Sequence, residues 1–262
     1  METKPRTADT DIYAEYLLCL ALDVGEGMLK NGAEISRVED TIERICKSYG
    51  AAHIEVFSII SFISAAIRMP DGSYSSQFRR IKSTVNNLGT LEYLNALSRE
   101  ICATTPPLEA FDEKIRAIKK KPQYPIYLRV ISSSFAVGGF ALFFGGNIVD
   151  ALVAMFIGAI ICFIDIYSTA RLNSMAKTVI FSFFSTIVAG LSAKIGLNTT
   201  PEYIIIGSIM LLVPGLAFGT ALRDLLCGDL LSGSLRTLQA FLGALMIAFG
   251  YMLGFTLLGG AL

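Results

Sequence analysis

One stretch of the sequence, Leu212–Arg236, sets charged side chains beside apolar runs of membrane-spanning length. Because Pro214 has no backbone N–H and its ring clashes with the preceding turn, a helix must kink or unwind there. In lipid, such a break persists only where protein or a water-filled cavity satisfies the freed backbone groups. Charges near membrane depth are costly, and by default they mark a functional site. The stretch therefore indicates a transporter.

The polar residues that follow the break fall on one helix face. Asp229, Ser232, Gly233 and Arg236 follow one another at i, i+3, i+4 and i+7, so they offer an anionic and a cationic group to a zwitterion. A guanidinium binds a carboxylate with two hydrogen bonds, as an amino-acid or dicarboxylate substrate would require. In the alternative interpretation, Asp229 caps the last helix, and Arg223 and Arg236 set the topology at a cytoplasmic boundary. The predicted substrate-binding residues are Pro214, Gly215, Arg223, Asp224, Gly228, Asp229, Ser232, Gly233 and Arg236.

Pro214 is expected near the middle of its membrane span. Counted from Tyr203, it lies 11 residues into the span, which is about 16 Å at a rise of about 1.5 Å per residue. That depth is close to the middle of a hydrocarbon core about 30 Å thick. Secondary transporters commonly build substrate sites from broken helices at this depth, because half-helix ends present free N–H and C=O groups.

The charges divide the chain into two halves. The sequence has 262 residues, of which 53% are hydrophobic, and a mean hydropathy of +0.58. Residues 1–125 carry 16 of the 22 Lys/Arg and 17 of the 22 Asp/Glu, whereas the remaining residues carry only 6 and 5. This division predicts a cytoplasmic domain at residues 1–122, followed by a membrane domain at 123–262.

The first half predicts an α+β domain in which helices flank a small antiparallel sheet. Apolar residues at helical spacing, such as Tyr16, Leu20 and Val24, indicate an amphipathic first helix. Runs rich in β-branched and aromatic residues indicate strands, and Asp71-Gly72 predicts a hairpin turn. The expected helices are 12–30, 34–49, 87–102 and 107–120, and the expected strands are 53–60, 62–69 and 73–81.

The second half predicts an all-α membrane domain of five transmembrane helices, since about 20 apolar residues cross a bilayer. Basic residues are concentrated on one side of these spans, at Lys119–Lys121, at Arg171 with Lys177, and at Arg223 with Arg236. The positive-inside rule therefore places the N-terminus in the cytoplasm and the C-terminus outside. The expected spans are about 126–146, 148–169, 178–197, 203–222 and 237–259.

Other charged residues have more than one interpretation. Arg129 and Asp165 are expected at a depth of about 5–8 Å on the same side, where they either pair or extend separately to the interface. Asp150, near the outer end of the second span, either relays protons or lies among the headgroups. The charged residues of the second helix either gate transport, bind a ligand or form a solvated helix face. The candidate gating or coupling residues are Arg129, Asp165, Asn31, Glu34, Arg37 and Glu39.

Several classes of function find no support in the sequence. The five cysteines lie far apart with no CxxC pair, so neither a zinc site nor a disulfide is predicted, and no metal or cofactor is expected. No catalytic or nucleotide-binding fingerprint occurs, and His53 falls in an expected strand, so an enzyme is not expected. The neutral net charge gives no reason to expect a nucleic-acid partner.

Two blocks of the sequence resemble the threonine/serine exporter family, and more narrowly its N-terminal half. They are NGAEISRVEDTIERICKSYG at 31–50, followed by HIEVF, and VPGLAFGTALRDLLCGDLLSGSLR at 213–236. The likeness runs from about residue 12 to 258. It implies a cytoplasmic domain with five spans and secondary export of serine and threonine, or of succinate in two-subunit relatives. In this sequence the family blocks fall on Asn31, Gly32, Glu34, Arg37, Glu39, Pro214, Gly215, Arg223, Asp224, Gly228, Asp229, Ser232, Gly233 and Arg236.

Together these features predict a subunit of a bacterial inner-membrane secondary exporter for small amino acids of the serine/threonine type. The alternatives are a dicarboxylate (succinate) exporter subunit and, in another class, a non-transporting membrane-anchored regulator or scaffold. Single-chain members of the family continue into a second membrane domain, so we expect a second small membrane subunit with four or five spans. Gly250 and Gly254 would form the face that packs against it. The other expected partners are a small carboxylate or amino-acid substrate and the lipid bilayer, with no nucleic acid.

Overall fold

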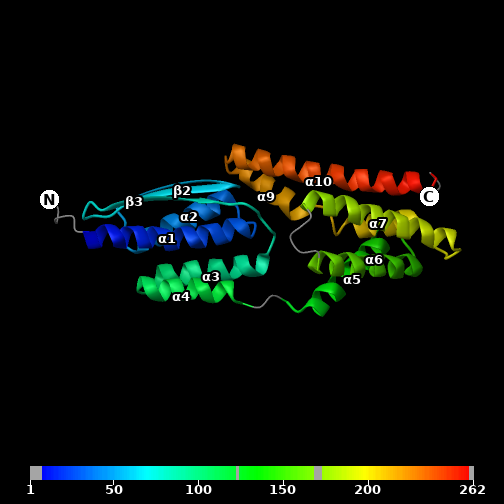
Figure 1. Ribbon diagram of the computed structural model, residues 1–262, viewed down its shortest axis with the longest axis horizontal. Helices are drawn as coiled ribbons and strands as arrows, with labels where there is room; N and C mark the ends of the chain where they lie inside the picture. The colour runs from blue at the N-terminus through cyan, green and yellow to red at the C-terminus, as the bar shows by residue number, and fades with distance from the viewer. Residues whose placement is uncertain (1–7, 122–123, 168–172, 260–262) are drawn as a thin grey trace. The chain divides into compact units, whose positions relative to one another are not determined.

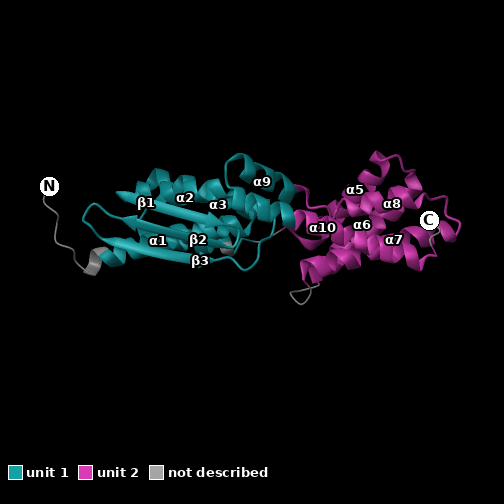
Figure 2. Cartoon of the chain, turned by 90° about the horizontal axis from the view of Figure 1, so that it is seen from above, with its two compact units in different colours: residues 1–122, 216–238 teal, residues 123–215, 239–262 magenta. Residues whose placement is uncertain are grey.

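The computed structural model describes residues 8–121, 124–167 and 173–259, and Figure 1 shows the order of their helices and strands. The chain divides into two compact units (Figure 2). Unit 1 comprises Met1–Pro122 and Leu216–Leu238, and unit 2 comprises Gln123–Gly215 and Gln239–Leu262. The loop residue Arg171, the predicted domain boundary at 122–123 and the C-terminal end lie outside the described residues.

Unit 1 contains helices and a small antiparallel sheet, as the sequence predicts. The strands lie in the order β1-β2-β3, and their register sets Val56 opposite Ala65 and Ala65 opposite Gln77. Its second segment, 216–238, adds most of one helix and the first turns of another. The elements are α1 (Ala8–Lys30), α2 (Ile35–Ser48), β1 (His53–Ile59), β2 (Phe62–Arg68), β3 (Tyr74–Arg80), α3 (Leu88–Thr104), α4 (Leu108–Lys119), α9 (Gly215–Leu226) and the start of α10 (Leu230–Leu257).

The turn between β2 and β3 forms where Asp71-Gly72 predicts it. Gly72 has a φ of +87°, a left-handed conformation that a side chain would strain. The Asp71 carboxylate accepts hydrogen bonds from the backbone N–H and the hydroxyl of Ser73, at 2.9 and 2.7 Å. The turn chemistry therefore lies in the two residues that the sequence singles out.

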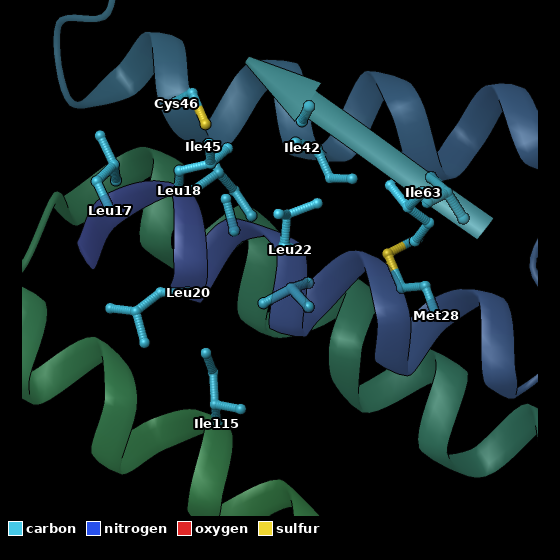
Figure 3. Close-up of a cluster of buried hydrophobic side chains, with 14 of the residues drawn as sticks. Leu17, Leu18, Leu20, Leu22, Met28, Ile42, Ile45, Cys46, Ile63 and Ile115 are labelled. Atoms are coloured by element: carbon cyan, nitrogen blue, oxygen red, sulfur yellow. The ribbon is translucent and has the colours of Figure 1, made fainter. Parts of the chain in front are cut away.

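Helix α1 lies at the centre of unit 1, with strands β2 and β3 and helix α2 on one side and α3 and α4 on the other. Figure 3 shows Leu18 and Leu22 of α1 among Ile42 of α2 and Ile63 of β2, with Ile115 of α4 below them. The expected amphipathic helix is therefore buried on more than one face. The residues of α1 that contribute to the core are Ala14, Leu17, Leu18, Leu20, Ala21, Leu22, Val24, Met28 and Leu29.

Unit 2 differs from the predicted five-span domain. Four described helices are long and apolar enough to cross a membrane, namely α5, α6, α7 and α10. The span expected at 203–222 is not one helix, because α8 ends at Ile209 and α9 begins at Gly215. Pro214 cannot donate to the carbonyl of Met210 and its ring clashes with that carbonyl, so the helix stops before it. The bounds of the unit 2 helices are α5 (Ile126–Phe143), α6 (Ile148–Tyr167), α7 (Ser174–Lys194) and α8 (Pro201–Ile209), together with the rest of α10.

Glycines set the closest helix contacts of unit 2. A Cβ on Gly207 of α8 would lie 2.9 Å from the backbone N of Ala141 and the carbonyl oxygen of Val137, both on α5. On α10, a Cβ on Gly250 would lie 2.4 Å from the carbonyl oxygen of Val179 on α7. Gly250 and its neighbour Gly254 thus pack against α7, and the expectation that they form a free face for a second subunit is wrong.

We predict that Gly207→Ala destabilises unit 2, because backbone atoms of α5 cannot give way to the added methyl group. A core contact of this kind costs about 1–3 kcal/mol. Thermal unfolding in detergent measures the effect. Gly139→Ala on α5 is the matched control, since its Cβ would meet nothing within 4 Å, and alanine is favoured over glycine in a helix by up to about 1 kcal/mol. Equal unfolding temperatures for the two variants would contradict the tight α5–α8 contact.

Candidate functional site

Helix α9 ends in a turn that reverses the chain into α10. Gly228 has a φ of +96°, and its N–H donates to the carbonyl of Leu225 at 3.2 Å. The N–H of Asp229 donates to the carbonyl of Asp224 at 2.9 Å. This pair of bonds is the Schellman motif, and only glycine takes its left-handed position without strain. The α10 backbone then returns close to α9, since a Cβ on Gly233 would lie 2.6 Å from Leu225 Cγ.

The same motif ends α1 and turns the chain into α2. Gly32 has a φ of +93°, its N–H donates to the carbonyl of Leu29, and the N–H of Ala33 donates to the carbonyl of Met28. The Asn31 side chain donates to the carbonyl of Gly27 at 2.7 Å. These bonds leave the Ala33 carbonyl and the first N–H groups of α2 for other partners.

Asp224 supplies the cap for α2. Glu34 occupies the N-cap position, but its side chain makes no capping hydrogen bond. The carboxylate of Asp224 on α9 accepts instead from the backbone N–H of Ile35, at 3.2 Å. A carboxylate at a helix N-terminus also interacts favourably with the helix dipole. The cap of α2 therefore comes from a residue 189 positions away in the sequence.

Arg236 completes this buried group. Its Nε lies 3.2 Å from Oδ2 of Asp224, and its Nη2 donates to the carbonyl of Ala33 at 2.7 Å. Asp224 is 0% exposed and Arg236 is 9% exposed. Nε and Oδ2 attract each other as charges without a hydrogen bond between them. We call Ala33, Ile35, Asp224 and Arg236 the buried network.

An ion pair flanks the buried network. Nη1 of Arg223 donates to Oε1 of Glu34 at 2.6 Å. The Arg223 side chain is 62% exposed, so this pair contributes little to stability. Arg223 keeps a solvent-facing guanidinium that a ligand can share.

Of the remaining N-terminal candidates, Glu39 supports the fold and Arg37 faces solvent. Glu39 accepts from the N–H and the hydroxyl of Ser58 on β1, at 2.6 and 2.9 Å. Burial raises the pKa of the Glu39 carboxyl, and the two hydrogen bonds from Ser58 oppose that rise. Arg37 is exposed. Glu39 therefore holds α2 to the sheet, and Arg37 alone among these side chains matches a solvated helix face.

In unit 2, Pro214 lies in the non-helical segment between α8 and α9, and Gly215 is the first residue of α9. A Cβ on Gly243 of α10 would lie 3.7 Å from Cγ of Pro214, so α10 passes beside the break. A cavity of about 470 Å³ lies along α8 and α10. Its lining is mostly apolar, with one carboxylate: Glu202, Ile205, Ile206, Ile209, Tyr251 and Phe255.

The predicted pairing of Arg129 with Asp165 is wrong. Nζ of Lys177 on α7 lies 3.1 Å from Oδ1 of Asp165. No ion pair joins Arg129 to Asp165 in the part of the chain that the structure describes, and Arg129 is exposed. Lys177 lies in the first turn of α7, and counting residues from the membrane boundary does not predict its contact with Asp165.

Asp150 has a role that neither expectation describes. It is fully buried, with one carboxylate oxygen accepting from the N–H of Asn147 and the other from the N–H of Thr200, at 2.8 and 2.7 Å. In turn, Oδ1 of Asn147 accepts from the N–H of Asp150 at 2.9 Å, and the two bonds together form a capping box at the start of α6. Asp150 thus holds the loop before α6 to the start of α8. The sequence signal was the Asn-x-x-Asp spacing.

The described residues contain no cluster of side chains suited to a metal ion. The predicted substrate residues do not form a single group within either unit. Three of them hold the buried network and its flanking pair, Gly228 and Gly233 shape the α9–α10 turn, and Ser232 is buried in the first turn of α10. Asp229 opens α10, where its carbonyl accepts from Gly233 at 2.9 Å.

Comparison with known proteins places these residues in a family. A family model for threonine/serine exporters (ThrE) matches residues 19–258. A protein of Klebsiella aerogenes named "Probable succinate transporter subunit YjjP" is 25% identical over 235 residues, covering 88% of this chain and 90% of that relative. The "Threonine/serine exporter" of Corynebacterium glutamicum is 24% identical over 251 residues and 91% of this chain.

The chain spans 50% of the length of the Corynebacterium relative, and no solved structure matches it. The family match covers nearly all of the described residues, including both the 31–35 segment and the α9–α10 turn of the buried network. The chain belongs to the threonine/serine exporter (ThrE) family.

Proposed function

We propose that the protein is one subunit of a secondary exporter that moves small amino acids of the serine/threonine type out of the cell. Four apolar helices of spanning length and the family match support a role in membrane transport. The observation that carries the proposal is the interruption between α8 and α9 at Pro214. A simple membrane anchor needs one continuous helix, whereas an interrupted one exposes backbone groups that can bind a substrate.

Succinate and related dicarboxylates are the second candidate substrates. The relative from Klebsiella aerogenes is named as a succinate transporter subunit, and it matches this chain over 90% of its own length. Both substrate classes carry a carboxylate, and the N-terminal end of a half-helix attracts an anion. We assign the backbone at Pro214 and Gly215 to this carboxylate.

We propose that α8, the break and α9 together make one crossing, so that the chain passes five times. Apolar side chains of α9 support this assignment, because Leu216, Phe218 and Leu222 are each at least half exposed. Five crossings put the N-terminal α+β part of unit 1 in the cytoplasm and the C-terminus outside, in agreement with the distribution of Lys and Arg. The membrane is the bacterial inner membrane.

We propose a second small membrane protein as partner. The Klebsiella aerogenes relative is itself named as a subunit, and the Corynebacterium glutamicum relative is twice as long as its match to this chain. The cavity along α8 and α10 offers an apolar face with Glu202 at one end. In secondary transporters with inverted repeats, the substrate site forms between two such halves.

For transport, we predict that Pro214→Ala strongly lowers efflux by allowing α8 and α9 to join into one helix. The measurement is efflux of labelled serine, threonine and succinate from cells that express this protein with its candidate partner. Pro125→Ala is the matched control, because Pro125 lies at the N-cap of α5, where no helix is interrupted. Unchanged efflux of every substrate on deletion of the protein would falsify the exporter proposal.

For the buried network, we predict that Asp224→Asn destabilises unit 1 by about 3–5 kcal/mol, because Arg236 is left buried without its countercharge. The asparagine still accepts the Ile35 N–H, so the loss reports the charge alone. Adding Arg236→Met should restore part of the stability. Asp112→Asn is the control, since it removes an i,i+4 helix pair with Arg116, whose side chain is 71% exposed, and such a pair contributes about 0.3–0.5 kcal/mol. Thermal unfolding of the purified protein measures all three.

For orientation, we predict that a membrane-impermeant maleimide labels a variant retaining only Cys227 in inside-out vesicles and not in intact spheroplasts. Cys227 is exposed in the α9–α10 turn. A variant retaining only Cys46 should stay unlabelled in the folded protein, because the thiol is buried and burial raises its pKa to about 12. Asn198→Cys, in the exposed loop before α8, should show the opposite sidedness. Labelling of Cys227 from outside would reverse the assignment.

A further inference from the structure

A second candidate site lies within unit 1, away from the buried network. It is a cavity of about 290 Å³ between α2 and α3, which we call the α2–α3 cavity. Small-molecule sites occupy about 300–1,000 Å³, so its size suits a ligand of only a few heavy atoms. Its lining consists of Thr41 and Arg44 from α2 and Ser98, Arg99, Cys102 and Ala103 from α3.

The first observation that points to a ligand in the cavity is the side chain of Thr41. Its side chain is 1% exposed, and among the described residues its hydroxyl has no hydrogen-bond partner. A threonine inside a helix commonly bonds back to a carbonyl one turn earlier, and Thr41 does not. A buried hydroxyl left unpaired is costly, and native structures keep few of them. Because Thr41 lines the cavity, a ligand there could accept its hydrogen.

The charged side chains that line the cavity indicate that the ligand carries a negative charge. Arg44 and Arg99 bring two guanidinium groups to the lining, and no carboxylate belongs to it. Arg44 is paired with Asp40 at 3.0 Å, but both side chains are more than half exposed, so this ion pair is weak. A ligand anion can therefore take the place of the Asp40 carboxylate. Glu100, beside Arg99 in the sequence, is held by Lys114.

The donors and acceptors of the lining also fit an oxyanion. Both arginines donate through a rigid fork that matches a carboxylate or phosphate. The hydroxyl of Ser98 donates to the carbonyl of Asn95 at 2.9 Å, so its oxygen remains free to accept from a ligand N–H or O–H. The donors available to a ligand in the cavity are thus the Thr41 hydroxyl, the Arg99 guanidinium and, once Asp40 is displaced, the Arg44 guanidinium.

We propose that the α2–α3 cavity binds a small oxyanion, a carboxylate or phosphate group, through Arg44, Arg99 and the hydroxyl of Thr41. The geometry gives the role of each residue: the arginines neutralise the charge, and Thr41 donates one hydrogen bond from the buried end. Binding at this position does not require transport, so it holds or fails separately from the proposed exporter function.

The test is a direct binding measurement on the purified full-length protein by titration calorimetry. The probes are inorganic phosphate and succinate, with chloride at equal ionic strength and the uncharged isostere succinamide as negative controls. We expect at least one oxyanion to bind. Arg99→Gln should weaken it by about tenfold to a hundredfold, the usual loss for a hydrogen bond to a charged group. Thr41→Val keeps the shape of the side chain, and it should weaken binding less than Arg99→Gln.

Arg116→Gln is the matched control, since Arg116 is an exposed helical arginine paired with an aspartate that lies outside the cavity. It should bind the probes as the unaltered protein does. Stronger binding of phosphate than succinate would assign the cavity to phosphorylated ligands, and the reverse order to carboxylates. The proposal is overturned if neither oxyanion binds, or if both bind Arg99→Gln and Thr41→Val with unchanged affinity.

Discussion

The buried carboxylate of Asp224 is the constraint on which the rest of unit 1 depends. A charge removed from water is tolerated only where partners replace its hydration. Here the partners are the first N–H of α2 and the guanidinium of Arg236, which in turn binds the carbonyl of Ala33. Each partner belongs to a different segment, so the carboxylate fixes the α1–α2 turn, α9 and the start of α10 together. Removing any one leaves a buried polar group unpaired.

Two Schellman turns position the groups of the buried network. Gly32 and Gly228 both take left-handed conformations at the ends of Schellman motifs. Each motif satisfies the last carbonyls of its own helix, so the polar groups that follow it are available to other segments. The two segments of the family blocks at 31–35 and 223–236 therefore form one structural unit, joined by the buried network. The sequence suggested that Asp224 and Arg236 bind substrate, whereas within unit 1 their charged groups lie against each other.

Local chemistry made most of the elements predictable. Asp71-Gly72 indicated the hairpin and Pro214 the break, since each acts within a few residues of itself. Contacts between distant segments were not predictable in this way. Nothing near Ile35 indicates that Asp224 caps it, 189 residues later. For Gly250 and Gly254, spacing predicted a close helix contact but not that α7 provides it. Depth alone likewise paired Asp165 with Arg129, where Lys177 is the neighbour.

The position of α9 relates the break to the buried network. The helix starts at Gly215, one residue after Pro214, and Asp224 lies ten residues after the proline, on the same continuous helix. An α-helix of twelve residues transmits a rotation or shift along its length, because its internal hydrogen bonds resist bending. In the proposed transport cycle, a change in the direction of α9 at its start would therefore move Asp224, which caps α2. For the proposed exporter, α9 is thus a continuous element through which the cap of α2 and the transport step can influence each other.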